Sequence, residues 1–448
     1  MASSAMGTAK GPAKLKAVTE LVDKLARDLE DATLSLKARE DALEELKIYG
    51  RDPAHADPIF TTEGISMLLR YGFDGPACDT ARAAQRVLAN AMLLRPETRQ
   101  IFVDKACAAK ACSELETDNW DTEFLVSRVL FLSTYGTSIN LEDLITNHRL
   151  ADRIVDNLGR HAKLVTTDEG KSPMSQPMED MALAETLKLL FNVTHFCKEQ
   201  TGRFAGAVPH IVALLWKQDV PPPRPLEAPF GPLINALLNM DLSIEATRDA
   251  VFPPKEPARV SERLIEILDA AMRTYPESDL ETVVTPLVSL LGKIHEHAPA
   301  PAKQRIRALL LPADNDRTSV LGRGDGLSAI LLKNSTNPIA PALRDAISHL
   351  LFDMSDKDAS TFVQNVGYGF ASGFLFQNNV PVPASASEAF GAGDVPGGQR
   401  LVNPITGQFL DSEKALDETP MSEEEREREA ERLFHQGSMA QHHSAFDL

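Results

Sequence analysis

The sequence predicts an all-α protein in which many short helices stack into a superhelix, followed by a partly disordered C-terminal extension. Apolar residues recur at three- and four-residue spacing through most of the 448 residues, which is the period of a helix with one apolar face. Aromatic residues make up only 6% of the chain, and alternating runs of β-branched residues are scarce, so strands are not expected. A repeated helical segment then distinguishes a stack from a bundle.

The helical stretches follow one another at regular intervals. A first pair occupies residues 15–46 and is interrupted near Asp31 and Ala32, where the apolar spacing breaks. Pro-containing connections, for example at residues 52–53 and 221–223, separate the later stretches. Twelve further helices are expected at residues 61–70, 79–94, 120–134, 141–158, 179–198, 203–216, 228–240, 258–273, 278–296, 303–311, 339–353 and 358–377.

Four five-residue segments within these helices align without gaps. They are residues 86–90, 128–132, 188–192 and 235–239, and they begin 42, 60 and 47 residues apart. The longest interval contains a polar stretch at residues 166–176 that we interpret as an inserted loop. A period of about 40–47 residues is typical of armadillo and HEAT units, which stack into a superhelix with an inner concave wall. Chance similarity among Leu-rich helices is the alternative.

The first and fifth positions of these segments are mostly polar and share one helix face. We call the resulting set the ladder: Arg86, Asn90, Arg128, Lys188, Asn192, Asn235 and Asn239. Amide side chains can pair with the backbone of a bound peptide, and the basic side chains can hold carboxylates, including a free chain end. The ladder therefore predicts capture of an acidic peptide in the groove. In the alternative, the amides bond to neighbouring turns and the basic groups are solvated.

The composition excludes several classes of protein. With 46 Lys and Arg against 64 Asp and Glu, the formal net charge of −18 repels nucleic acid and anionic lipid. No apolar run approaches the roughly 20 residues of a membrane helix, and the N-terminus lacks the apolar core of a signal peptide. Four scattered cysteines suit neither a disulfide framework nor a zinc site. We expect a cytoplasmic monomer without a metal, cofactor, nucleic-acid partner or integral membrane segment.

No catalytic constellation is found, so we do not expect an enzyme. Residues 367–373 have the glycine content of a phosphate loop, but no strand precedes them and no Gly-Lys-Ser or Gly-Lys-Thr follows. Residues 322–326 are expected to form a turn, and His295 and His297 fall on different helix faces. The glycine-rich element instead suits close packing between units, with these residues in the contact: Gly367, Tyr368, Gly369 and Gly373.

Several stretches resemble the synembryn family. Residues 184–194 (AETLKLLFNVT) are similar to one of its repeat helices. The most specific match is at residues 362–375 (FVQNVGYGFASGFL), followed at the family's distance by residues 403–407 (NPITG) and then by residues 420–427 (PMSEEERE). Together with weaker matches, the resemblance covers roughly residues 80–434. After Phe434 the sequence departs from the family pattern and ends in a short tail, so we expect a fungal-type member with a shortened C-terminus.

The resemblance implies an armadillo/HEAT-like superhelix that chaperones nascent G-protein α subunits (Gα) and promotes release of their GDP without covalent chemistry. It implies that the groove holds the C-terminal helix and free carboxylate of Gα, and that the segment after the repeats reaches the nucleotide-binding domain of Gα. Such a protein is cytoplasmic and reaches the plasma-membrane cortex through Gα. The resemblance assigns the contact with the nucleotide-binding domain to six residues of the C-terminal segment: Asn403, Pro404, Ser422, Glu425, Leu433 and Phe434.

The chain is expected to divide into four parts. The superhelix occupies residues 1–377, a flexible linker 378–402, an extension with a short charged helix 403–434, and a disordered tail 435–448. Ser422 and Glu425 form a capping box for that helix, whose few apolar residues suit docking onto a partner or onto the superhelix. A solvated tail is the alternative. For the whole chain, the rival function is a helical-repeat scaffold that binds an acidic peptide without affecting nucleotide.

Overall fold

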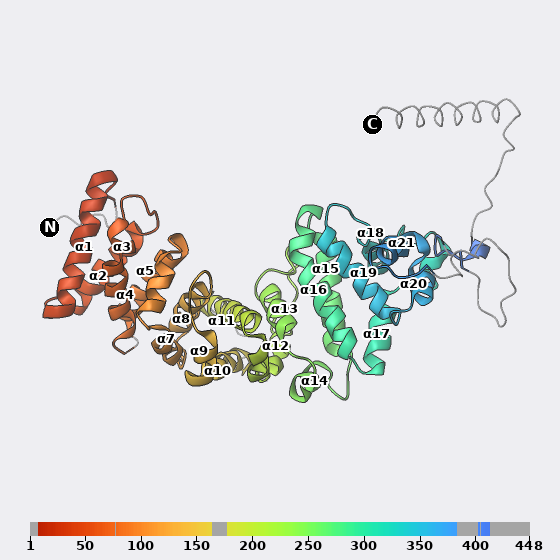
Figure 1. Cartoon of the computed structure of the whole chain (residues 1–448), viewed down its shortest axis with the longest axis horizontal. Helices are drawn as coiled ribbons and strands as arrows, with labels where there is room; N and C mark the ends of the chain where they lie inside the picture. The colour runs from red at the N-terminus through yellow and green to blue at the C-terminus, as the bar shows by residue number, and fades with distance from the viewer. Residues whose placement is uncertain (1–7, 77, 164–176, 383–401, 404, 413–448) are drawn as a thin grey trace, which may run out of the picture.

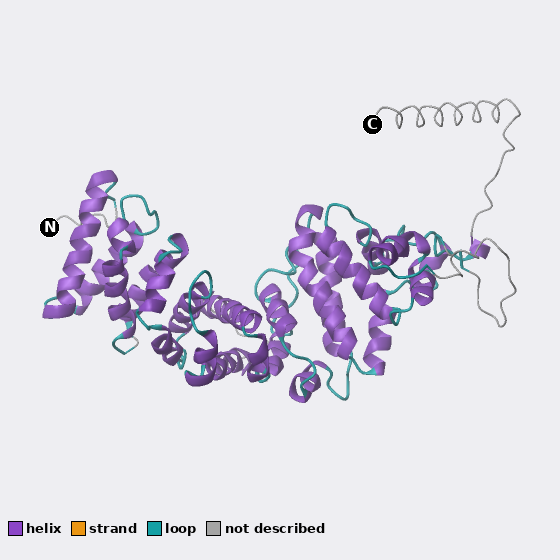
Figure 2. Cartoon of the chain, in the orientation of Figure 1, coloured by secondary structure: helices purple, strands orange, loops and turns teal. Residues whose placement is uncertain are grey.

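The computed structural model describes residues 8–76, 78–163, 177–382, 402–403 and 405–412, and Figure 1 shows them as a curved stack of helices. These residues contain twenty-one α-helices and three short 3₁₀ helices. Figure 2 shows no strand among these residues, and their only β structure is an isolated antiparallel bridge between Val402 and Phe409. The predicted all-α superhelix is confirmed for the described part of the chain.

The first part of the stack contains seven helices, and its first break lies where the sequence predicts it. Ala32 adopts the left-handed conformation (φ 50°) after α1, and the side chain of Ser35 caps α2 by accepting a hydrogen bond from the Ala38 amide. The helices are α1 Gly11–Asp31, α2 Leu36–Tyr49, α3 Asp57–Phe60, α4 Thr62–Phe73, α5 Asp79–Leu94, α6 Thr98–Asp104 and α7 Ala108–Glu114.

The middle and C-terminal parts continue the same alternation of helices and short turns. The middle part contains α8 Trp120–Ser133, α9 Leu141–Asn147, α10 Leu150–Lys163, α11 Pro177–Phe196, η1 Lys198–Phe204, α12 Ala207–Leu214, α13 Phe230–Asn239 and α14 Glu245–Val251. The C-terminal part contains α15 Arg259–Thr274, α16 Glu277–His297, α17 Ala300–Leu310, η2 Asp316–Thr318, α18 Leu327–Asn334, α19 Pro341–Met354, α20 Ala359–Val366, α21 Tyr368–Gln377 and η3 Leu410–Ser412.

Two layers of helices build the stack. The inner layer consists of α5, α8, α11, α13, α16 and α19, each packed against the next. In the middle of the molecule, α9, α10, α12 and α14 form the outer edge of the bend, and α8, α11 and α13 form the inner edge (Figure 1). An inner helix has neighbours on both sides and beneath it, so it buries residues around more than one face, as α8 does with the consecutive residues Leu125, Val126 and Ser127.

The structure corrects three predicted helices and adds five. The stretch predicted at 141–158 is two helices, α9 and α10, because Arg149 adopts φ 57° between them. The stretch at 203–216 is a 3₁₀ helix followed by α12, and the stretch at 358–377 divides at Gly367, whose φ is 83°. Five short helices, α3, α6, α7, α14 and α18, have no predicted counterpart, since helices of four to eight residues contain too few apolar positions to show a period.

Candidate functional site

The first positions of the ladder lie on successive inner helices and remain accessible. Arg86 is on α5, Arg128 on α8, Lys188 on α11 and Asn235 on α13. Lys188 is exposed, and the other three side chains are partly exposed. The inner helices pack side by side, and α8, α11 and α13 form the inner edge of the bend (Figure 1). We call these four residues, one on each of four successive inner helices, the row.

Each basic residue of the row is oriented by a carboxylate of the same chain. Arg86 Nη2 lies 2.7 Å from Asp121 Oδ2 at the start of α8. Arg128 Nη1 and Lys188 Nζ both contact Glu185 Oε1, at 3.0 Å and 2.9 Å. Glu185 is almost fully buried, with 5% of its side chain exposed. Two cations thus share one buried carboxylate, and this leaves a positive excess that can accept a carboxylate from a ligand.

Two amides of the ladder are engaged inside the chain. Asn192 is only 3% exposed, donates from Nδ2 to Thr134 Oγ1 at 2.7 Å and accepts from the Tyr135 hydroxyl at 3.3 Å. Asn239 Nδ2 donates to the Phe191 carbonyl at 3.0 Å. These bonds join α11 to the end of α8, and α13 to α11. The amides of Asn192 and Asn239 therefore connect neighbouring units in this structure, whereas Asn90 and Asn235 stay partly exposed.

An exposed apolar strip follows the ladder on the same three helices. Leu93 and Leu94 end α5, Tyr135 follows α8 and Phe196 ends α11, and between 37% and 53% of each is exposed. They lie seven or eight residues after the first ladder position of their segment. This spacing places Leu93, Leu94 and Phe196 near the same helix face as that position, whereas Tyr135 lies two residues beyond the end of α8. The five-residue aligned segments do not include this strip, although extending each segment by one turn would include it. Along α5, α8 and α11, the basic residues therefore lie near the middle of each helix, and the exposed apolar residues lie at or just after its C-terminal end.

A buried polar network lies beneath the row and fixes α8, α10 and α11 to one another. Glu123 is fully buried; its Oε1 accepts from Thr186 Oγ1 at 2.6 Å and lies 3.0 Å from His161 Nε2, and its Oε2 accepts from Arg160. Burial alone would raise the pKa of Glu123, but the hydrogen bonds from His161 and Thr186 and the charge of Arg160 hold it below its ordinary value. The ring of Trp120 stacks on His161 at 4.6 Å. This network keeps the inner helices in a fixed register.

The glycine-rich element and the Asn403 segment, 34 residues apart in sequence, are in contact. The Gly369 amide donates to the Ile405 carbonyl at 3.1 Å, and a Cβ at Gly367 would lie 3.1 Å from the Gly407 nitrogen. The close approach that these glycines permit is therefore to the backbone of residues 405–407, not to another helix. Tyr368 begins α21 and is partly exposed, and a Cβ at Gly373 would meet no atom within 4 Å.

The other residues assigned to the C-terminal segment lie outside the described residues. They are Pro404, Ser422, Glu425, Leu433 and Phe434. Of that set, Asn403 alone is described, and its Oδ1 accepts from the Ile405 amide at 2.9 Å and from the Thr406 amide at 3.2 Å. Asn403 therefore stabilises the turn that contacts the glycine-rich element.

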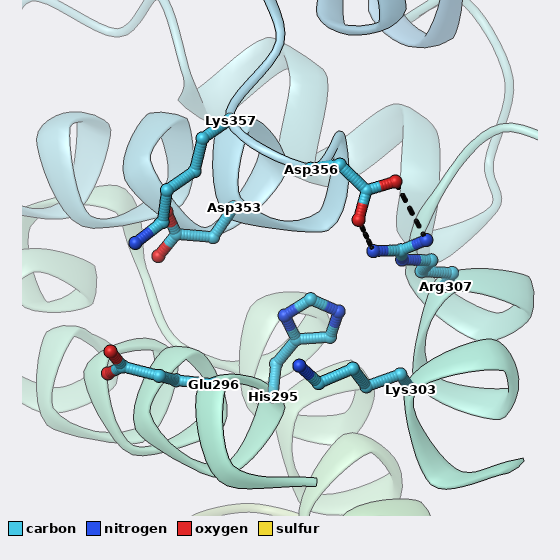
Figure 3. Close-up of a pocket in the computed structure, with 7 residues that line it drawn as sticks. All are labelled: His295, Glu296, Lys303, Arg307, Asp353, Asp356 and Lys357. Carbon is cyan, nitrogen blue, oxygen red and sulfur yellow. Dashed lines mark hydrogen bonds and ion pairs between the residues drawn. The ribbon is translucent and has the colours of Figure 1, made fainter. Parts of the chain in front are cut away.

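A separate pocket of about 190 Å³ lies among α16, α17 and the end of α19. Figure 3 shows His295 beside Lys303, and Arg307 facing Asp356. His295 is 3% exposed; burial and the charges of Arg307 and Lys303 lower its pKa to about 4, so the imidazole is neutral at pH 7. Glu296, Asp353 and Lys357 complete the lining, so the pocket favours no single ligand charge.

The described residues suggest neither a metal centre nor a membrane span. Nowhere in the described ranges do three or more His, Cys, Asp or Glu side chains form a group that could hold a metal ion. None of the described helices is both long enough and apolar enough to cross a bilayer. What the arrangement offers chemically is a binding surface on the inside of the bend.

Comparisons with known proteins give consistent results. A family model described as guanine nucleotide exchange factor synembryn matches residues 42–436. The synembryn-like chaperone of Schizosaccharomyces pombe is 25% identical over 369 residues, covering 76% of this chain and 66% of the relative. The chaperone Ric-8A of Xenopus laevis is 23% identical over 440 residues, covering 87% of this chain and 79% of the relative. A crystal structure of an engineered protein aligns with a TM-score of 0.42 and 17% identity, over 76% of this chain and 80% of that chain.

Proposed function

Because the chain belongs to the synembryn family, we propose that it binds the α subunit of heterotrimeric G proteins, chaperones its folding and promotes release of its GDP. The match to the family model supports this proposal most directly. It spans residues 42–436 and so includes every inner helix that presents the ladder and the apolar strip. The chain works as a monomer in the cytoplasm and reaches the membrane cortex through its Gα partner.

The inner surface suits an amphipathic helix with a free C-terminal carboxylate. The apolar side of such a helix covers the strip at the ends of α5, α8 and α11, which contains Tyr135 and Phe196. Its carboxylates then reach the basic row, where Arg128 and Lys188 share one buried carboxylate. This complementarity supports binding of the Gα C-terminal helix, because a local basic row can attract an acidic helix although the chain has a net charge of −18.

Nucleotide release follows from preferential binding and requires no covalent step. A protein that binds the nucleotide-free conformation of Gα more tightly than the GDP-bound one lowers the affinity for GDP by the same coupling free energy. Withdrawing the C-terminal helix from the body of Gα would disturb the packing beneath the guanine pocket. Residues after 402 then contact the nucleotide-binding domain.

The chaperone role uses the same contacts. A newly made Gα without nucleotide exposes its C-terminal helix, and any protein that binds the folded form but not the unfolded chain shifts the equilibrium toward folding by mass action. One binding surface therefore accounts for both roles.

The proposal is tested by measuring release of labelled GDP from purified Gα with increasing concentrations of this chain. The expected result is a saturable increase in the release rate on the order of tenfold, within the usual range of coupling between two sites. Excess GTP should dissociate the complex.

A chain that binds Gα at saturation and leaves the release rate unchanged would be the helical-repeat scaffold. A chain that does not bind Gα at all would contradict both the exchange and the chaperone roles. A matched control replaces two exposed basic residues outside the inner surface, Lys16 and Arg224, with Glu.

A further inference from the structure

A short segment following the helical stack folds back onto its last units. Residues 402, 403 and 405–412, which we call the docked segment, form a compact turn closed by hydrogen bonds from the Asn403 amide to the Gln408 carbonyl (2.7 Å) and from the Gly407 amide to the Asn403 carbonyl (2.8 Å). The bridge between Val402 and Phe409 aligns its two sides. The segment therefore has its own defined structure.

Backbone hydrogen bonds connect the docked segment to two separate places on the stack. The Leu321 amide donates to the Thr406 carbonyl at 3.1 Å, and the Phe409 amide donates to the Arg317 carbonyl at 2.9 Å, both in the connection between α17 and α18. The Gly369 amide donates to the Ile405 carbonyl at the start of α21. Two connections distant in sequence are thus held by one short segment.

The docked segment approaches the stack so closely that no side chain fits at Gly407. Gly407 has a φ of 69°, and a Cβ at this position would lie 2.3 Å from Leu321 Cδ1. Phe409 is 4% exposed, so the segment also buries an aromatic ring. Any side chain at position 407 would have both an unfavourable backbone conformation and a collision with Leu321.

Arg317 bonds the docked segment to the stack from within. Its side chain is buried (8% of the residue is exposed), and it donates from Nη1 to the Gly407 carbonyl at 3.0 Å and from Nη2 to the Asn365 carbonyl at 2.9 Å. Burial lowers the pKa of Arg317. A guanidinium held by two carbonyls of different segments is costly to desolvate, so its placement is difficult to explain by stability alone.

We infer that the docked segment is a positioning device that fixes the point from which the residues after 412 begin, and that Arg317 is its positioning residue. This inference rests on the proposed function, in which those residues act on the nucleotide-binding domain of Gα. Without these contacts, that starting point would no longer be fixed relative to the connection between α17 and α18 or to the start of α21. Docking raises the effective concentration of the following residues at their target.

The test uses the full chain with Gly407→Ala and, separately, Arg317→Ala. Gly292→Ala is the matched control, because Gly292 lies within α16 and a Cβ there would meet no atom within 4 Å. Hydrogen exchange reports docking through the amides of Leu321, Gly369 and Phe409. Both docking variants should accelerate exchange at these amides and leave α5, α8 and α11 unchanged.

The functional readouts separate positioning from a structural defect. Affinity for a Gα C-terminal peptide should stay within about twofold, whereas stimulated GDP release should fall roughly tenfold as the effective concentration drops. Two results would overturn the inference. In the first, amide exchange shows that the segment has undocked but the rate of GDP release is undiminished. In the second, amide exchange is unchanged in both variants. If the unaltered chain does not stimulate release, the proposed function fails instead, and amide exchange still reports whether Arg317 and Gly407 hold the segment.

Discussion

Two carboxylates in the first helices show how neighbouring groups set the charge of a buried side chain. Burial by itself would raise the pKa of Asp28, but Arg39 and the Tyr71 hydroxyl donate to it and lower the value to about 2. Glu114 receives one hydrogen bond from Gln85, at 2.7 Å, and burial raises its pKa to about 7. Asp28 is therefore ionised at neutral pH, and a large fraction of Glu114 is protonated there.

The raised pKa of Glu114 predicts a pH-dependent loss of stability. A carboxyl group whose pKa is higher in the folded state stabilises the fold below its unfolded value, near 4.5, and this contribution is lost as the pH rises through about 7. Glu114→Gln removes the penalty and keeps an acceptor for Gln85. The variant should be more stable than the unaltered chain at pH 8 and differ little from it at pH 4.5. Thermal unfolding at the two pH values measures this, and an equal difference at both would contradict it.

At the scale of elements, the sequence predicts the inner helices well and the short connecting helices poorly. The predicted stretch at 79–94 coincides with α5, and the stretch at 120–134 ends one residue after α8. These helices are long and packed on several sides, so their apolar positions are numerous. The break at Arg149 has no sequence signal, because an arginine in the left-handed conformation is set by tertiary packing. The packing of the docked segment onto the stack could not be predicted from the sequence either, because its contacts join residues about 40 to 90 positions apart.

The ladder shows the limit of helical period as a guide to binding residues. Spacing places Arg86 and Asn90, or Lys188 and Asn192, on one face, but it does not say whether that face meets solvent or the next helix. The fifth position of α11 turns toward α8, so Asn192 is buried, while the first position stays accessible. The exposed Tyr135 and Phe196 were missed because isolated aromatic residues at helix ends are ordinarily assigned to the core.

This difference in burial predicts opposite consequences for two Asn-to-Ala substitutions. Asn192→Ala removes the amide that donates to the buried Thr134 hydroxyl and accepts from the Tyr135 hydroxyl, and it should destabilise the chain by about 1–3 kcal/mol. Asn90→Ala, at a partly exposed position, should change stability by less than about 0.5 kcal/mol and weaken peptide binding instead.

Chemical unfolding and peptide titration of both variants provide the measurement. Equal stability losses would contradict the assignment of Asn192 to the contact between units. Unchanged peptide affinity in Asn90→Ala would remove Asn90 from the binding surface.

At the scale of the whole molecule, the proposed binding of a Gα peptide depends on the bend of the stack. The inner helices follow the bend (Figure 1), and α5, α8 and α11 carry a basic residue near the middle and exposed apolar residues at or just after the C-terminal end. The docked segment lies at the other end of the described stack, on the last units. The proposed peptide-binding surface and the docked segment therefore lie in different regions of the stack, so substitutions can test them separately.

The most direct test of the account is fluorescence anisotropy of a labelled Gα C-terminal peptide titrated with the full chain. The unaltered chain should bind saturably, and Arg86→Glu combined with Lys188→Glu should weaken binding at least about tenfold, equivalent to 1.4 kcal/mol, with helix content unchanged. The control with the same charge change, Lys16→Glu with Arg224→Glu, should bind as the unaltered chain does. If reversing the two inner-surface charges leaves the peptide affinity within twofold of the control, the inner surface is not the binding site.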